Sequence, residues 1–218
     1  MLAVVVADGE PAPEDAQLVR DADLVIAADG GANWLESLGV RPHVLVGDLD
    51  SLDLATVARL GLLGTHVEQH PPDKDASDTE LALEAALRAG ADRVLILGAF
   101  GGSRLDHELA NALLLVDPAF AAGDVRLHRG ATQVRAIEGP GNLTIEVGAG
   151  GSVTLLPIRA DAVGVTTEGL RYGLEDGTLA IGRSRGLSNV VVEEPASVSL
   201  RAGTLLVIEI GTTKEGES

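Results

Sequence analysis

A change of sequence pattern near residue 130 constrains the fold more than any other feature. Before it, apolar runs rich in Val, Leu and Ile alternate with segments whose apolar residues recur at helical spacing. Such runs are typical of strands buried on both faces of a parallel sheet. After it, short segments alternate in polarity between Gly-rich turns, which indicates an all-β module. We therefore predict an α/β domain over residues 1–130 and a β-sandwich over residues 131–218.

The first domain is predicted to be an open, doubly wound, mostly parallel sheet with right-handed crossovers. The clearest helix is Ser77–Ala89, because Ser77 and Glu80 form a capping-box pattern and Gly90 follows. The other expected helices are Glu14–Ala22, Ala32–Leu38, Leu52–Leu60 and Leu105–Val116. The six expected strands are Leu2–Ala7, Leu24–Ala28, Val44–Val46, His66–His70, Val94–Leu97 and Val125–His128.

The second domain is predicted to contain strands and no helix. Its tail, from Gly211 onward, is expected to be disordered. The expected strands are Gln133–Ile137, Leu143–Val147, Val153–Leu156, Val190–Val192, Val198–Leu200 and Leu205–Ile210.

Charge and composition exclude several classes of protein. A formal net charge of −17 leaves no basic face for a nucleic acid. No apolar run approaches the roughly 20 residues that span a bilayer, so no membrane association is expected. The chain contains no cysteine, which suits a reducing compartment, and we expect a cytoplasmic location. An enzyme this acidic needs a cation if its substrate carries phosphate.

The segment GDLDS follows the third expected strand, where ligands of parallel sheets bind. Asp48 and Asp50 are two residues apart, so in extended backbone both carboxylates would point the same way. Paired hard oxygen ligands are what Mg²⁺ prefers. A turn with solvated aspartates is the alternative.

The segment DKDASDTELAL lies at the start of the fourth expected helix. Helix capping accounts for Ser77 and Asp78 but not for Asp73, Lys74 and Asp75. A lysine among aspartates at this edge suits phosphate contact by the ammonium and metal binding by the carboxylates.

Two Gly-rich turns fall at the same edge. In GAFGGSRLDH, backbone N–H groups at the helix start and the guanidinium of Arg104 can hold phosphate. His107 and Asn111 share one face of that helix, where a structural role is the alternative to catalysis for His107. The chain lacks a GxxxxGK[ST] loop, which argues against a Walker-type nucleotidase. In ADGGANWL, Asp29 ends a strand and two glycines permit close backbone approach.

Six segments together resemble the thiamine pyrophosphokinase family. They are ADGGAN, GDLDS, DKDASDTELAL, GGSRLDHELAN, TEGLRYGL and GLSN, in the family's order from Asp29 to Asn189. The resemblance implies an N-terminal α/β domain that binds ATP and Mg²⁺ and a C-terminal β-sandwich. It also implies a homodimer in which thiamine lies between the α/β domain of one subunit and the β domain of the other.

The matching motifs carry site residues onto this chain. The resemblance implies that Asp48, Asp50 and Asp78 are the catalytic and Mg²⁺-binding carboxylates. The residues implied to bind the nucleotide are Asp29, Gly30, Gly31, Lys74, Gly102, Arg104 and Asp106. Those implied to line the thiamine pocket are Thr167, Tyr172, Ser188 and Asn189.

Three positions depart from the family pattern. Tyr172 stands where family members usually have Trp, which keeps an aromatic ring for stacking but with less area. Ser103 is inserted in the usual GGRxDH, ahead of Arg104. Trp34 replaces a common arginine in ADGGANRL, which either removes a phosphate contact or supplies a stacking surface.

The resulting hypothesis is transfer of diphosphate from ATP to the hydroxyl of thiamine, with release of AMP. Asp78 or Asp50 is the candidate acceptor of the hydroxyl proton. Three alternatives remain open at this point: a pyrophosphokinase acting on a pterin-like alcohol, a non-catalytic nucleotide or metabolite sensor, and a β module that binds carbohydrate by itself.

Overall fold

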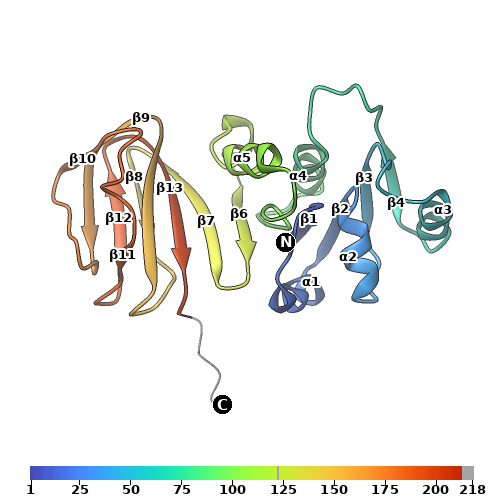
Figure 1. Ribbon diagram of the computed structural model, residues 1–218, viewed down its shortest axis with the longest axis horizontal. Coiled ribbons are helices and arrows are strands. Elements are labelled where there is room, and N and C mark those ends of the chain that lie inside the picture. Colours follow the sequence, from blue (N-terminus) through green and yellow to red (C-terminus); the bar gives the residue numbers. More distant parts are fainter. Residues whose placement is uncertain (122, 213–218) are drawn as a thin grey trace, which may run out of the picture. The chain divides into compact units, whose positions relative to one another are not determined.

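The chain divides into two compact units, Met1–Gly130 and Ala131–Ser218. The structure is a computed structural model that describes residues 1–121 and 123–212, and each unit is described by itself (Figure 1). The expectation of a disordered tail falls mainly on residues 213–218, which lie outside the described residues. Within the described part of the chain, no helix is both long and apolar enough to cross a membrane.

Unit 1 contains a parallel sheet of six strands, as the sequence predicts. The strands lie in the order β4-β3-β2-β1-β5-β6, and every neighbouring pair among them is parallel. Burial is nearly complete along β1, β2 and β5, which explains their continuous Val, Leu and Ile runs. The bounds are β1 Leu2–Val6, β2 Leu24–Ala28, β3 Val44–Gly47, β4 His66–Gln69, β5 Arg93–Leu97 and β6 Asp124–Arg129.

Five α-helices connect these strands. Helix α4 starts as predicted, because the Ser77 hydroxyl accepts a hydrogen bond from the Glu80 N–H at 3.1 Å. Helix α3 starts two residues later than expected, because Asp53 caps it through the Thr56 N–H at 2.8 Å. The bounds are α1 Ala16–Asp21, α2 Gly31–Ser37, α3 Leu54–Leu62, α4 Asp78–Arg88 and α5 Leu105–Leu114, with short 3₁₀ turns η1 Pro13–Asp15 and η2 Pro118–Phe120.

The strand order reverses between β1 and β5, and this places the site. Right-handed crossovers put α1 to α3 over one face of the sheet and α4 and α5 over the other (Figure 1). A crevice therefore opens beyond the carboxyl ends of the strands at the point of reversal. The βα turns that carry the sequence motifs all end at this edge.

Helix α2 packs so closely on β1 that its first residue has no room for a side chain. A Cβ atom at Gly31 would lie 2.0 Å from the main-chain oxygen of Val6. We expect Gly31→Ala to lower the free energy of unfolding by about 1–3 kcal/mol, because backbone must move to relieve the overlap. Thermal unfolding of the full chain measures this. Gly61→Ala in α3 is the matched control, since its Cβ would meet nothing within 4 Å. Equal melting temperatures for Gly31→Ala and the unsubstituted protein would contradict the packing.

Unit 2 is built from antiparallel strands around one long strand, β9. Its first half pairs with β13 and its last residues pair with β12, while β10 and β11 pair with it separately. Strand β13 also pairs with β7, and β12 with β8. The bounds are β7 Thr132–Glu138, β8 Gly141–Thr144, β9 Ser152–Glu168, β10 Gly177–Leu179, β11 Asn189–Val190, β12 Ser197–Leu200 and β13 Ala202–Ile210.

The predicted all-β character of unit 2 is confirmed, and no helix occurs among its described residues. Three strand predictions differ from the structure. Strand β9 was expected to end at Leu156 but continues to Glu168, β10 was not expected, and β8 lies before most of the predicted Leu143–Val147. The strands of unit 2 enclose one apolar core, which includes Val153 of β9, Val198 of β12 and Leu205 of β13.

A buried ion cluster ties β7 and β13 to the segment after β8. Glu209 is fully buried and accepts hydrogen bonds from the guanidinium of Arg135, including one from Nε at 2.9 Å. It also accepts from the N–H groups of Glu146 and Val147. Arg135 in turn donates to the Thr144 carbonyl oxygen at 2.7 Å and to the Glu146 carboxylate at 3.0 Å.

Candidate active site

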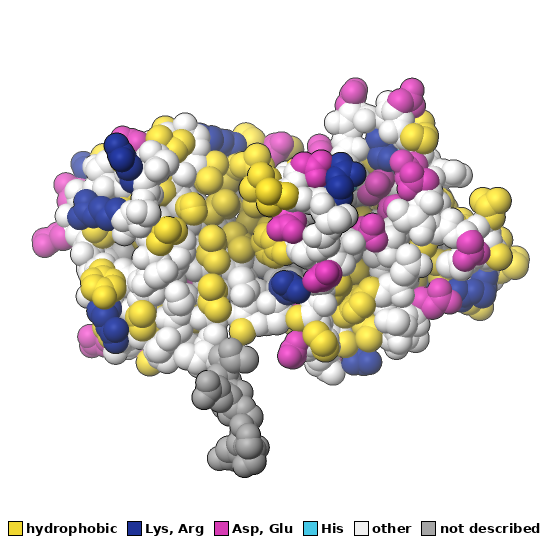
Figure 2. Space-filling model, in the orientation of Figure 1, with side chains coloured by type: hydrophobic (Ala, Val, Ile, Leu, Met, Phe, Trp, Pro, Cys, Tyr) yellow, Lys and Arg dark blue, Asp and Glu magenta, His cyan; other side chains and the backbone are white. Residues whose placement is uncertain are grey.

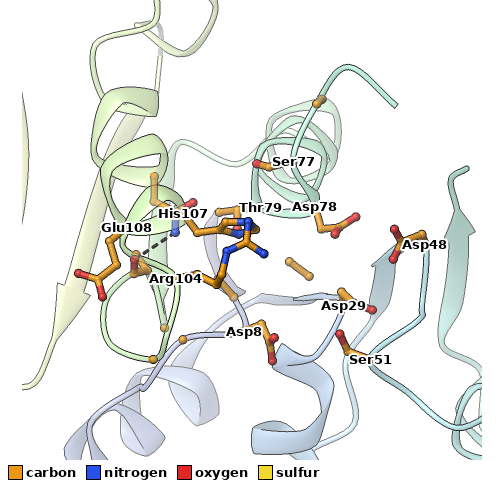
Figure 3. Close-up of a pocket in the computed structure, with 18 of the residues that line it drawn as sticks. Asp8, Asp29, Asp48, Ser51, Ser77, Asp78, Thr79, Arg104, His107 and Glu108 are labelled. Carbon is orange, nitrogen blue, oxygen red and sulfur yellow. Dashed lines mark hydrogen bonds between the residues drawn. The ribbon is translucent and has the colours of Figure 1, made fainter. Parts of the chain in front are cut away.

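A cavity of about 650 Å³ opens at the carboxyl edge of the unit 1 sheet. Its lining comes from the ends of β1, β2, β3 and β5, from the segment before α4, and from the starts of α4 and α5 (Figure 3). All four predicted motif segments reach it, as the convergence argument requires. Figure 2 shows acidic side chains gathered over the segment between β4 and α4, at the top of the view.

Three carboxylates from three different turns meet on one side of this cavity. Asp29, Asp48 and Asp78 each offer an oxygen atom within 4.8 Å of the other two (Figure 3). Asp29 Oδ1 and Asp78 Oδ1 are buried and have no hydrogen-bond partner. Buried carboxylate oxygens without donors are costly unless a cation satisfies them. The donor set is all oxygen, which suits a hard divalent ion such as Mg²⁺.

Lys74 supplies positive charge to this carboxylate cluster. Its ammonium nitrogen lies 3.2 Å from Asp48 Oδ2 and 3.0 Å from Asp78 Oδ1, the latter an ion pair without hydrogen-bond geometry. Burial alone lowers the pKa of Lys74, but its contacts with Asp78 and Asp48 raise it above the ordinary value. Burial raises the pKa of Asp48, but the hydrogen bonds from Lys74 and from the Asp50 N–H, together with the Lys74 charge, outweigh burial and lower that pKa. Lys74 is therefore a cation that lines the cavity beside the carboxylates.

The surroundings of Asp29 disfavour its ionised form. It is 6% exposed and has φ 44°, in the left-handed region that Asp and Asn tolerate. Burial raises its pKa, a hydrogen bond from Ser51 lowers it, and the charges of Asp78 and Asp50 raise it further. A buried acid whose ionised form is disfavoured by its neighbours is a functional-site signature.

The structure places Asp50 differently from the sequence argument. The premise of extended backbone from Asp48 to Asp50 is wrong, because Leu49 between them has φ 66°. Asp50 is exposed, lines the cavity and accepts a hydrogen bond from the Ser51 hydroxyl at 3.3 Å. Asp29, which sequence reasoning assigned to the nucleotide, takes its place beside Asp48 and Asp78.

Sequence reasoning missed Asp8, which lines the cavity directly after β1. Burial raises the pKa of Asp8, the His107 charge lowers it, and Asp50 raises it. A Cβ atom at Gly30 would lie 1.9 Å from Asp8 Oδ1, so the two turns fit against each other. The signal was available, since Asp8 ends a predicted parallel strand as Asp29 does.

The two glycines of ADGGANWL do not open toward the cavity. Gly30 packs against Asp8 and Gly31 against β1, and neither belongs to the cavity lining among the described residues. Trp34 is partly buried, packs against the unit 1 core and does not line the cavity, so it supplies no stacking surface there. Asp29 is the residue of this motif that reaches the site.

The turn between β5 and α5 forms the opposite side of the cavity (Figure 3). Gly102 has φ 91° and a Cβ there would meet nothing within 4 Å, so the loop leaves open space at that point. Ser103, Arg104 and His107 line the cavity, whereas Asp106 is outside the described lining. The predicted common face of His107 and Asn111 does border the cavity, and Asn111 donates to the Ala99 carbonyl oxygen at 3.0 Å.

Arg104 is engaged by Asp106 in a two-pronged ion pair. Nε and a terminal nitrogen of Arg104 donate to the two Asp106 oxygens at 2.9 and 2.7 Å. This hydrogen bonding lowers the pKa of Asp106 to about 2, and both side chains are exposed. Exposed ion pairs contribute little to stability, so the guanidinium can exchange this carboxylate for a phosphate at small cost.

The four predicted thiamine residues all lie in unit 2. Tyr172 is 65% exposed, whereas Thr167 and Asn189 are buried and bond to the main chain of residues 172–174. Ser188 is exposed and has φ 56°. Its N–H donates a hydrogen bond to the Thr154 hydroxyl at 3.0 Å. The turn that carries Tyr172 is thus supported by two of the other three residues.

Two family models match the chain. One, described as "Thiamin pyrophosphokinase, catalytic domain", matches residues 16–127, and the other, "Thiamin pyrophosphokinase, vitamin B1 binding domain", matches residues 142–205. Among curated proteins, the chain is 27% identical over 186 residues to thiamine pyrophosphokinase from Bacillus subtilis, covering 85% of this chain and 86% of that one. It is also 27% identical over 229 residues to thiamine pyrophosphokinase 1 from Arabidopsis thaliana, covering 90% and 81% respectively.

Solved structures agree in fold. The crystal structure of the Bacillus subtilis thiamine pyrophosphokinase superposes with a TM-score of 0.86 at 26% identity, covering 98% of this chain and 100% of that one. The thiamin pyrophosphokinase from Candida albicans superposes with a TM-score of 0.81 at 15% identity, covering 96% and 90%, which is a likeness of fold alone.

Proposed function

The chain belongs to the thiamine pyrophosphokinase family, and from this premise we propose how its residues transfer a diphosphate group from ATP to thiamine. It is an ATP:thiamine diphosphotransferase, whose products are thiamine diphosphate and AMP. The observation that carries the residue assignment is the meeting of Asp29, Asp48 and Asp78 at the carboxyl edge of a parallel sheet, where the buried Asp29 Oδ1 accepts no hydrogen bond and Asp78 Oδ1 has only an ion pair with Lys74.

Asp29, Asp48 and Asp78 are the proposed ligands of Mg²⁺. The buried Asp29 Oδ1, which has no hydrogen-bond partner, and the all-oxygen donor set support this assignment. When bound, Mg²⁺ neutralises charge that develops on the phosphate oxygens. Asp50 remains a proposed contributor from the exposed rim of the cavity, either as a further ligand or as an acceptor of the hydroxyl proton of thiamine.

The proposed phosphate contacts come from the two sides of the cavity. When Asp48 and Asp78 hold a metal, the ammonium group of Lys74 is free to turn to a phosphate oxygen. Opposite, Arg104 exchanges Asp106 for phosphate, and the main chain around Gly102 approaches the nucleotide. Asp106 then acts by holding Arg104 ready, without contact to ATP.

The thiamine hydroxyl oxygen is proposed to attack the β-phosphorus of ATP in line, with AMP leaving. Asp78 or Asp50 accepts the hydroxyl proton, because both carboxylates line the cavity. Positioning and charge neutralisation supply most of the rate in reactions of this type. The acidic cavity also favours the thiazolium cation of thiamine over neutral competitors.

We further propose that the working enzyme is a homodimer located in the cytoplasm. The thiamine residues of unit 2 would then meet the acidic cavity of a second copy. Tyr172 is exposed, and the turn that carries it is held by residues of its own unit. This supports a ligand site that a second surface completes.

The test of the function is one incubation with ATP, Mg²⁺ and thiamine, followed by chromatography of nucleotide and thiamine products. Thiamine diphosphate and AMP in equal amounts are expected. Turnover of a pterin alcohol but not of thiamine would favour another acceptor. ATP binding without AMP release would favour a sensor.

Asp48→Asn is expected to lower kcat by a factor on the order of 10² or more, because it removes one of the three clustered carboxylates. Asp50→Asn is expected to lower kcat by about tenfold, since Asp50 is exposed and outside the cluster. Initial rates over a Mg²⁺ titration measure both effects. Asp73→Asn is the control, because Asp73 is exposed and outside the cavity lining. An Asp50→Asn protein that loses as much activity as Asp48→Asn, with a shifted Mg²⁺ requirement, would make Asp50 a full ligand.

A further inference from the structure

The side-chain amide of Asn189 is hydrogen-bonded to the main chain of Tyr172. The Tyr172 N–H donates to Asn189 Oδ1 at 3.0 Å, and Asn189 Nδ2 donates to the Tyr172 carbonyl oxygen at 2.8 Å. Asn189 Oδ1 also accepts from the Val190 N–H at 2.9 Å. Asn189 is 8% exposed. Its amide therefore faces the main chain rather than open solvent, and it binds the peptide groups on both sides of Cα 172.

The rest of the turn is held just as firmly. The Thr167 hydroxyl accepts from the Leu174 N–H at 2.9 Å, and the Thr167 N–H donates to the Leu174 carbonyl oxygen at 3.0 Å. On the other side, the Arg171 N–H donates to the Val190 carbonyl oxygen at 2.9 Å. Leu170 is buried in the unit 2 core, and Leu174 packs against it. Segment 170–174 is thus anchored at both ends and in the middle.

Tyr172 carries the aromatic ring of this anchored segment, and it is 65% exposed. Holding the backbone of an exposed ring removes conformational freedom before a ligand arrives, so less free energy is lost when the ring is covered. A flat heterocycle stacking on the ring gains from this preorganisation. The effect depends on Asn189 although its amide is turned to the protein.

We propose that Asn189 is a positioning residue that sets the affinity for thiamine through the main chain of Tyr172, and that it is not itself a thiamine ligand. Thr167 has the same role at the other end of the segment. The inference rests on the proposed function, because thiamine is the ligand whose binding is measured. It differs from the family-based expectation, in which Thr167 and Asn189 line the thiamine pocket themselves.

A double-mutant cycle on the full-length enzyme tests the proposal. Asn189→Ala is expected to raise the KM for thiamine by about tenfold, with kcat and the KM for ATP changed by less than about twofold. In the Tyr172→Ala background, the same Asn189 substitution is expected to change the thiamine KM by less than about twofold. An equal factor in both backgrounds would make Asn189 a direct ligand and overturn the proposal. A fall in kcat together with a rise in the KM for ATP, each as large as the change in the thiamine KM, would also overturn the proposal.

Asn189→Asp gives a milder variant that keeps the two accepted hydrogen bonds and loses the donated one. Its effect on the thiamine KM is expected to fall between those of the unsubstituted enzyme and Asn189→Ala, and an effect as large as that of alanine would contradict the bond-by-bond account. Asn142→Ala is the matched control, because Asn142 is an exposed asparagine of β8. It is expected to leave all three kinetic constants unchanged.

A second measurement does not depend on activity. Tyr172 is the only tyrosine and Trp34 the only tryptophan, so in a Trp34→Phe protein the ultraviolet emission comes from Tyr172. Asn189→Ala in that background is expected to lower the emission anisotropy, since the ring-bearing backbone gains motion, while Asn142→Ala leaves it unchanged. Unchanged anisotropy in Asn189→Ala would overturn the inference even if thiamine is turned over. A clear drop in anisotropy in a protein that fails to use thiamine would support the role of Asn189 in holding the Tyr172 backbone and would refute the proposed function.

Discussion

The Asp29→Asn protein is expected to lose activity by a factor on the order of 10² or more, while its metal-free form unfolds at a higher temperature than the unsubstituted protein. Activity falls because the substitution removes one of the three clustered carboxylates. Stability rises because the ionised group is buried, lacks a partner at Oδ1 and is repelled by Asp78 and Asp50. Asparagine keeps the shape and tolerates φ 44°, so backbone strain adds nothing.

The size and pH dependence of this stabilisation can be worked out. A gain of about 1 kcal/mol corresponds to about 2–4 °C in a chain of this length. Burial raises the pKa of Asp29 above 3.8, so the folded protein binds a proton there more readily than the unfolded chain. Protonation of Asp29 therefore stabilises the native protein fully below the unfolded-state pKa of 3.8. This stabilisation is lost as pH rises through the raised pKa of the folded state. The gap between the two melting temperatures should narrow as pH falls toward 4.

Thermal unfolding with and without Mg²⁺ checks the same assignment from the other side. Added Mg²⁺ is expected to raise the melting temperature of the unsubstituted protein, since a ligand that binds only the folded state stabilises it. It should raise that of Asp29→Asn far less. Equal Mg²⁺-induced shifts in both proteins would remove Asp29 from the metal site.

Arg135→Met is expected to lower the free energy of unfolding by about 3–5 kcal/mol. The substitution leaves the fully buried carboxylate of Glu209 without its guanidinium partner and leaves the Thr144 carbonyl oxygen without a donor. Denaturant unfolding of the full chain, followed by a probe of β structure, measures the loss. Asp176→Asn is the control, because it breaks the exposed ion pair with Arg201 and should cost less than about 1 kcal/mol.

The double substitution Arg135→Met with Glu209→Leu separates the charge from the packing. Removing both charges is expected to recover part of the loss, because no unpaired ion remains buried. Recovery should be incomplete, since the N–H groups of Glu146 and Val147 then lack their acceptor. Costs that simply add in the double variant would show that the two side chains act independently.

The α/β unit could be predicted closely from the sequence because its signals are local. Buried parallel strands such as Leu24–Ala28 are continuous apolar runs, and Ser77 and Gly90 mark both ends of α4. The continuation of β9 beyond Leu156 could not be predicted, because Pro157, Arg159 and Gly164 interrupt the alternation that identifies a strand. Pairing with β13, β12 and β10 overrides that local signal.

The candidate site was predictable as a place and less so as an arrangement. The sequence predicted that four motif segments meet at one edge of the sheet, but it grouped Asp48 and Asp78 with Asp50 and assigned Asp29 to the nucleotide. Which carboxylates face one another depends on single backbone angles, such as φ 66° at Leu49, and no spacing rule contains these. Likewise, the residue types at Asn189 and Thr167 suited a ligand pocket, but only the hydrogen bonds show that their amide and hydroxyl hold the main chain.

The position of β13 has a consequence for how the protein forms during synthesis. This strand lies between β7 and β9, although it comes last of the three in the chain. A nascent chain that has emerged only as far as β12 has β7 and β9 without the strand that joins them. Unit 1, in contrast, has all six of its strands by residue 129. Translation therefore releases unit 1, which can fold early, before unit 2 is complete. The strand edges of β7 and β9 stay exposed until β13 emerges, and they depend on β13 for protection from aggregation.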